Sequence, residues 1–242
     1  MVHKAPRRRR RAMWMAAMFV SVASVASAQD DLVLEPALHY FTRHDAGDIF
    51  ELFDVIRPAA VSEAERGRIL AMLPADGNKD DLNPAQLKKL AAIRRILELH
   101  QRAAVYVIQV IEVPQAAVAL HARAVVLVSE RALDLLEADE LQALVAHEIG
   151  HEYFWAESFH ARRDTNQSSL RRLELLCDGF AVVTLAHAGV SPHRLTSALD
   201  KIVRHNRDRF GGALNEDSYP SVTERRRFVG RLVEWLGRSR AQ

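Results

Sequence analysis

The sequence contains a single cysteine, Cys177, among 242 residues. One cysteine permits no disulfide within the chain even in an oxidising compartment, which excludes a disulfide-stabilised scaffold. Cys177 lies among leucines, so it is expected to be a small buried hydrophobe. Internal repeats and low-complexity tracts are also absent, and the 214 residues after position 28 suit a single domain with one sizeable core.

No apolar stretch is long enough to cross a bilayer. The strongest candidate, residues 12–25, has 14 residues, whereas a spanning helix needs about 20. It follows a run of arginines and precedes Ala26-Ser27-Ala28, the small-residue pattern of a signal-peptidase site. Residues 1–28 are therefore predicted to be a signal peptide cleaved after Ala28, which indicates an exported, periplasmic protein. Retention of this segment as a membrane anchor is the alternative.

The chain has no excess of positive charge once residues 1–28 are removed. Residues 1–28 hold six of the 33 Lys and Arg and none of the 31 Asp and Glu, so the remainder carries 27 basic and 31 acidic residues, a formal net charge of −4. The basic character of the whole chain is thus a feature of export. The sequence predicts no nucleic-acid partner and no membrane span in the mature chain.

Capping residues predict helices in the N-terminal part. A capping box at Ser62 predicts a helix over residues 62–73. The pair Asn83-Pro84 predicts a second helix over residues 83–100, because asparagine caps a helix and proline suits its first turn.

The remaining segments predict a mixed architecture. Two apolar, β-branched runs, residues 104–111 and 124–128, predict short strands. Residues 191–205 and 223–236 predict helices, separated by a glycine-rich loop. The fold class is therefore predicted as α+β and mainly helical, in one domain (29–242) with an N-terminal helical part (29–103) and a catalytic core with a small β-sheet (104–242).

The most informative motif is His-Glu-Ile-Gly-His at residues 147–151. An α-helix advances about 3.6 residues per turn, so His147 and His151 emerge on one face about 6 Å apart along the axis, where both imidazoles can bind one Zn²⁺. Glu148 then lies beside the metal, where a water molecule needs a general base. The alternative is a chance pair on an exposed helix. The acidic start and apolar i, i+3, i+4 spacing of residues 137–146 disfavour it.

A second helical segment, residues 171–181, offers a third ligand. A catalytic zinc site has three protein ligands and leaves the fourth position to water. Glu174 and Asp178 lie one turn apart on one face, so Glu174 can reach the metal and Asp178 can accept the outer N–H of a ligand histidine. Leucines flank Glu174, which disfavours a fully solvated carboxylate. The predicted set is one zinc ion per chain on His147, His151 and Glu174.

The residues after His151 exclude one related pattern. The metzincin motif requires a glycine and a third histidine where this sequence has Phe154 and Glu157. His160 lies nine residues beyond His151, after the predicted helix end, and is expected to be a surface histidine rather than a ligand.

Taken together, the two metal motifs resemble those of the gluzincin metallopeptidases of the CAAX prenyl protease and HtpX type. The first is His147-Glu-x-x-His151, and Glu174-x-x-x-Asp178 follows 23 residues later with a small residue at Ala181. The resemblance implies a zincin-like metallopeptidase fold with the metal site between two helices. It also implies Glu174 as the third ligand and Asp178 as the outer partner of a ligand histidine.

The resemblance covers about residues 105–228. Residues 117–120 and 124–129 resemble the family's edge strand and second strand, and Tyr219-Pro220 with Arg225 resembles its His-Pro…Arg segment. Because no mature stretch could span a membrane, the chain resembles a soluble periplasmic member rather than the multi-spanning ones.

The sequence departs from this family at two places. Its edge-strand Asn-Ala is replaced by Ala116-Ala117, and its downstream His-Pro by Tyr219-Pro220. In the family that histidine stabilises the oxyanion, and a tyrosine hydroxyl can donate a hydrogen bond to the same charge, so Tyr219 is a candidate catalytic residue. Alternatively Tyr219 packs beside Pro220, and His205 and Arg225 become the next candidates.

These motifs predict a zinc-dependent endopeptidase. Substrates would be extended or misfolded envelope proteins, aligned as an extra strand along residues 116–120. One alternative is a zinc-containing, chaperone-like binding module with little proteolytic activity. Another is a membrane-tethered structural protein that keeps its N-terminal segment.

Overall fold

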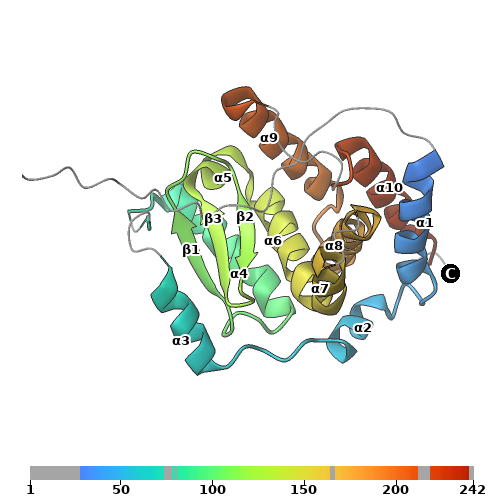
Figure 1. The fold of residues 1–242 in the computed structure, drawn as a ribbon, viewed down its shortest axis with the longest axis horizontal. Coiled ribbons are helices and arrows are strands. Elements are labelled where there is room, and N and C mark those ends of the chain that lie inside the picture. The colour runs from blue at the N-terminus through green and yellow to red at the C-terminus, as the bar shows by residue number, and fades with distance from the viewer. Residues whose placement is uncertain (1–27, 74–77, 80, 164–166, 212–218, 240–242) are drawn as a thin grey trace, which may run out of the picture.

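The computed structural model describes residues 28–73, 78–79, 81–163, 167–211 and 219–239 (Figure 1). Residues 1–27 of the predicted signal peptide lie outside the described residues. Gly212 of the predicted glycine-rich loop also lies outside them. Within the described residues no helix is both long and apolar enough to cross a membrane.

The described part of the chain is mainly helical and contains one small sheet, which confirms the predicted mainly helical α+β class. Four helices come first: α1 (Ala28–Thr42), α2 (Ile49–Val55), α3 (Glu63–Met72) and α4 (Pro84–Leu99). The sheet follows as β1 (Val107–Ile111), β2 (Val118–His121) and β3 (Val125–Ser129). The remaining helices are α5 (Glu130–Leu135), α6 (Ala138–Tyr153), α7 (Trp155–Arg163), α8 (Gln167–Ala188), α9 (His193–Phe210) and α10 (Val222–Ser239).

Helix starts follow the predicted capping residues. The Ser62 hydroxyl accepts the Glu65 backbone N–H at the start of α3. At the start of α4, Asn83 and Gln86 form a reciprocal capping box. Helix α9 is longer than predicted because nothing after residue 205 breaks it before Gly211, whose φ of +76° suits only glycine readily.

The sheet has the order β1-β3-β2, so β2 is an edge strand. Strand β1 pairs in parallel with β3, and β2 pairs antiparallel with it. The predicted strand at 104–111 begins only at Val107, because Arg102 O accepts the backbone N–H groups of Val105 and Tyr106 in a turn. Strand β2 packs beside α6, which brings the sheet edge to the central helix (Figure 1).

Helix α6 lies at the centre of the molecule and is buried on nearly all sides. Helices α4, α8 and α9 pack around it together with β2, and one core cluster extends from Val33 to Leu236. A helix in such a place is usually apolar all round, yet α6 buries several polar side chains that need partners. Glu152, for example, contacts Arg102, Arg123 and Tyr106.

Two glycines let α8 approach its neighbours closely. A Cβ on Gly150 of α6 would lie 3.0 Å from Cys177 Cα of α8. A Cβ on Gly179 would collide with the ring of Phe41 on α1. Helix α8 is therefore held between α6 and α1, with Glu174 and Asp178 on the side that faces α6.

Candidate metal centre

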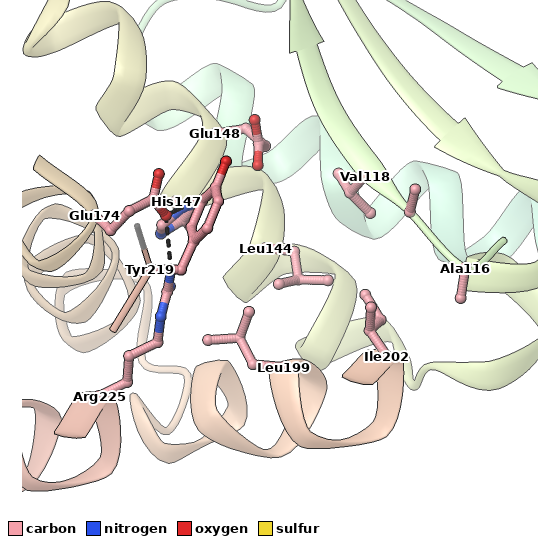
Figure 2. A pocket seen from close by; sticks show the side chains of 11 residues that line it. Ala116, Val118, Leu144, His147, Glu148, Glu174, Leu199, Ile202, Tyr219 and Arg225 are labelled. Carbon is pink, nitrogen blue, oxygen red and sulfur yellow. Dashed lines mark hydrogen bonds and ion pairs between the residues drawn. The ribbon is translucent and has the colours of Figure 1, made fainter. Parts of the chain in front are cut away.

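Helices α6 and α8 bring two histidines and one glutamate together. His147 Nε2 lies 3.4 Å from Glu174 Oε2, and His151 Nε2 lies 3.6 Å from Glu174 Oε1. The ligand atoms of the three side chains all lie within 4.8 Å of one another, so this group could hold a metal ion. The centre thus lies between two helices, and Figure 2 shows His147 and Glu174 side by side at one end of a cavity.

A residue on α8 contacts the Nδ1 atom of each histidine, on the side of the ring away from Glu174. Asp178 Oδ1 lies 2.9 Å from His147 Nδ1, one turn beyond Glu174 as predicted from the helical spacing. When His147 donates its Nδ1–H to Asp178, the Nε2 lone pair faces Glu174, where a metal would bind. Cys177 Sγ lies 3.4 Å from His151 Nδ1, and Cys177 is fully buried.

Arg225 of α10 joins the two carboxylates of α8. Its Nη1 donates to Asp178 Oδ1 at 2.8 Å and its Nη2 donates to Glu174 Oε2 at 2.7 Å. The sequence pattern indicated Arg225 only as part of the family-like segment and as an alternative oxyanion donor. The sequence held a stronger signal for Arg225, which shares a helix face with Phe228, Val229 and Leu232. An arginine on an apolar face is buried, and a buried guanidinium requires carboxylate partners.

Glu148 lies in the same cavity on the strand side of α6. Its side chain is 3% exposed, and its Oε2 accepts the backbone N–H of Leu120 in β2 at 2.9 Å. Burial raises the pKa of Glu148 to about 7, although the nearby His147 and the Leu120 N–H act in the opposite direction. A carboxylate with such a pKa can accept and release a proton near neutral pH.

The charges of the centre favour a divalent cation. Glu148, Glu174 and Asp178 are buried carboxylates, and Arg225 is the buried cation that contacts two of them. With neutral histidines their formal charge is −2. Burial opposes charging His147, yet its hydrogen bonds with Asp178 and Glu174 raise its pKa to about 10. Metal and proton compete for that imidazole, and a dication would balance the carboxylates in place of the proton.

The cavity beside the centre has a volume of about 40 Å³. His147, Glu148, Glu174, Tyr219 and Arg225 line its polar end. Tyr219 is half-buried, and Figure 2 shows its hydroxyl pointing in the direction of Glu148. The structure therefore brings Tyr219 to the centre, and the adjacent Pro220 is buried.

Two other histidines lie away from this centre. His160 is exposed on α7, a helix that was not predicted from the sequence, and it is not in the candidate metal group. His205, the other reserve oxyanion donor, is half-buried on α9 and does not line the cavity.

The predicted substrate edge is shorter than residues 116–120. Asn206 of α9 accepts the Ala116 backbone N–H and donates to the Ala116 carbonyl, both at 2.9 Å, and Glu148 holds the Leu120 N–H. The prediction that a peptide pairs with the strand from Ala116 onward was thus wrong. The Asn206 side chain already binds the backbone N–H and carbonyl of Ala116. Asn206 was missed, although it falls on the buried stripe of α9 after Leu199 and Ile202.

The sequence matches no model of a known protein family and no curated protein. The resemblance to the CAAX prenyl protease and HtpX type therefore rests on the motif residues alone.

Proposed function

We propose that this protein is a zinc-dependent endopeptidase with a zincin-like domain. The observation that carries the proposal is the convergence of His147, His151 and Glu174, with Glu148 buried in the same cavity. Two imidazoles and one carboxylate form the ligand set of several catalytic zinc sites, which keep one position open.

The donor chemistry fits Zn²⁺ better than a hard cation. Imidazole nitrogens suit zinc, whereas Mg²⁺ and Ca²⁺ prefer all-oxygen sites. When bound by His147, His151 and Glu174, one Zn²⁺ per chain supplies a Lewis acid that polarises a scissile carbonyl and lowers the pKa of water.

The other residues take distinct parts in hydrolysis. Glu148 accepts a proton from the attacking water and returns it to the departing amine, and the Leu120 N–H keeps its carboxylate in place. Tyr219 donates its hydroxyl hydrogen to the developing oxyanion. Asp178 orients His147, and Arg225 holds Asp178 and Glu174 in position.

The proposed substrates are extended segments of unfolded or misfolded envelope proteins, in line with the proposed export to the periplasm. An extended backbone can pair with a sheet edge with little demand on sequence. Strand β2 is such an edge; Asn206 holds Ala116 and Glu148 holds the Leu120 N–H, so a peptide would pair through Val118 between them.

Metal analysis and casein cleavage by the purified protein test this function. Glu148→Gln preserves the shape of the side chain but cannot accept the proton, so we expect zinc to remain and turnover to fall at least about 10²-fold. Glu157→Gln, at an exposed carboxylate on α7, is the matched control and should keep full turnover. Undiminished cleavage by Glu148→Gln would contradict the mechanism. Zinc binding with no cleavage by the unmodified protein would favour the binding module instead.

A further inference from the structure

The turn between β2 and β3 has a backbone conformation that its residues do not favour. The Ala124 N–H donates to the His121 carbonyl at 3.0 Å, so residues 121–124 form a tight turn. Its two central residues, Ala122 and Arg123, have φ values of 48° and 58°. Hairpin turns with two positive φ values usually contain Asn-Gly, because a Cβ is strained in this region. An arginine at this position therefore indicates that its side chain has a function elsewhere.

The Arg123 side chain connects the turn to the C-terminal end of α6. Its Nη2 donates to Glu152 Oε1 at 3.2 Å and to the carbonyl of Ala59, in the segment after α2. Its guanidinium carbon also lies 5.7 Å from the centre of the Trp155 ring at the start of α7, within the range of a cation–π contact. Three separate segments therefore hold this one guanidinium.

Glu152 is fixed from another side. It is fully buried, and its Oε2 accepts hydrogen bonds from Arg102 Nε at 2.9 Å and from the Tyr106 hydroxyl. Both donors lie in the segment before β1. Moving the carboxylate would leave buried polar groups unpaired, which is costly for each of them. Glu152 is thus a rigid point to which Arg123 attaches the turn.

The hairpin meets α6 at two points. Glu148 and Glu152 are one helical turn apart on α6, so they lie on the same face. Glu148 accepts the Leu120 N–H at 2.9 Å, and Glu152 accepts Arg123, three residues later along the hairpin. As the proposed general base, Glu148 exchanges partners during hydrolysis. The contact between Arg123 and Glu152 takes no part in that exchange, so it can hold the hairpin throughout.

The place of β2 matters because a substrate would take its alignment from this strand. The Ser129 N–H donates to the Ala117 carbonyl, so in the antiparallel register Ala117 and Ala119 turn their backbone groups toward β3 and Val118 turns its groups outward. A peptide paired with Val118 is therefore placed relative to the metal centre by β2 itself. A misplacement of about 1 Å at a reacting centre can cost about 10²-fold in rate.

We propose that Arg123 is a positioning residue that keeps the β2 edge in place for an extended substrate while Glu148 transfers protons. Arg123 does not line the cavity and acts through Glu152 and the turn. This inference rests on the proposed peptidase function and assigns substrate alignment to a residue outside the cavity.

Cleavage of a long and a short substrate tests this role. The probes are an octapeptide and a blocked dipeptide with the same central Ala–Leu bond, and only the octapeptide is long enough to pair with β2. Asparagine adopts positive φ readily, so Arg123→Asn keeps the turn and loses the contact with Glu152. We expect kcat/KM to fall about ten-fold or more for the octapeptide and less than about two-fold for the dipeptide.

Two further variants separate positioning from general stability. A single nitrogen of Arg123 makes both hydrogen bonds, so the ammonium of Arg123→Lys should restore at least about half of the octapeptide rate. Lys201→Gln is the matched control, because it removes the cation from Glu140, another fully buried carboxylate near the start of α6. It should leave the ratio of octapeptide to dipeptide cleavage unchanged.

Hydrogen exchange of the protein with zinc added tests the contact without a substrate. In Arg123→Asn the amides of residues 118–121 should exchange about ten-fold faster, whereas those of α8 should not change. Equal exchange in this variant and the unmodified protein, or an unchanged octapeptide-to-dipeptide ratio, would overturn the positioning role. Faster exchange, with neither substrate cleaved by the unmodified protein, would support the contact and overturn only the proposed hydrolysis.

Discussion

Glu174 connects every part of the candidate centre. It contacts His147 and His151 as the third proposed ligand and accepts a hydrogen bond from Arg225. Burial disfavours its charged form, but the charges of His151, Arg225 and His147 lower the pKa of Glu174 below its ordinary value. The carboxylate is therefore ionised and available to a metal across the physiological pH range.

Removing this carboxylate should release zinc. Outer partners of metal ligands change affinity about 10–100-fold, so loss of a ligand in Glu174→Ala should lower zinc affinity by more than about 100-fold. His160→Ala, at an exposed histidine, should leave zinc affinity unchanged. Competition with a chromophoric chelator measures both affinities. The reverse order would show that His160, not Glu174, is the ligand.

The hydroxyl of Tyr219 should matter for turnover but not for metal binding. Loss of one oxyanion donor costs about 10²- to 10³-fold in kcat, and we expect this for Tyr219→Phe with KM little changed. Tyr219→His restores a donor at the same place and should retain activity. Steady-state kinetics on a peptide substrate measure the effect. Wild-type turnover in Tyr219→Phe would leave Tyr219 as a packing residue.

At the level of elements, the spacing of α6 and α8 controls the distance between the proposed ligands. In Gly150→Ala the new methyl would lie 3.0 Å from Cys177 Cα, so α8 must move by a few tenths of an ångström. We expect zinc affinity to fall about ten-fold, comparable to loss of an outer partner.

Gly179→Ala provides the contrast for that prediction. The added methyl collides with Phe41 on α1, on the side of α8 away from the metal centre. Overpacking of this kind costs about 1–3 kcal/mol, so the free energy of unfolding should fall while zinc affinity stays constant. Urea unfolding and chelator competition measure the two quantities. Equal zinc affinities in both variants would rule out control of ligand spacing by the α6–α8 contact.

Local signals explain which elements the sequence predicts. The caps at Ser62 and Asn83 and the histidines four apart on α6 act within one helix, so their consequences follow from helix geometry. Contacts between distant segments are different. Nothing local connects Arg225 to Asp178 or Asn206 to Ala116, and only their positions on apolar helix faces indicated that partners were needed.

At the scale of the whole molecule, stability should depend on a buried histidine that is not part of the candidate metal group. His100 is 1% exposed, and its ring contacts Thr184 and lies near Tyr153, Phe50 and Phe180. Burial, reinforced by the charges of Arg57 and Arg102, lowers the pKa of His100 from 6.5 to about 3. The unfolded chain therefore binds a proton here at pH values where the folded protein does not.

Acid should thus weaken the fold through His100. Its contribution is complete above about pH 6.5 and is lost as the pH falls toward 3, on the order of 3 kcal/mol between pH 7 and pH 4. Urea unfolding of metal-free protein should show a smaller loss over this range in His100→Gln than in the unmodified protein. His160→Gln, at an exposed site, should lose as much as the unmodified protein. Identical pH profiles for all three would contradict this assignment.

Arg225 lies on α10, the last described helix, and this position determines when the candidate centre can form during synthesis and folding. Glu174 and Asp178 are synthesised well before Arg225, so they lack its hydrogen bonds until α10 docks. Because the chain is synthesised from its N-terminus, the centre cannot be completed before α10 has been made. If the chain crosses a membrane unfolded, as the predicted signal peptide implies, the proposed hydrolytic centre would be completed only after export.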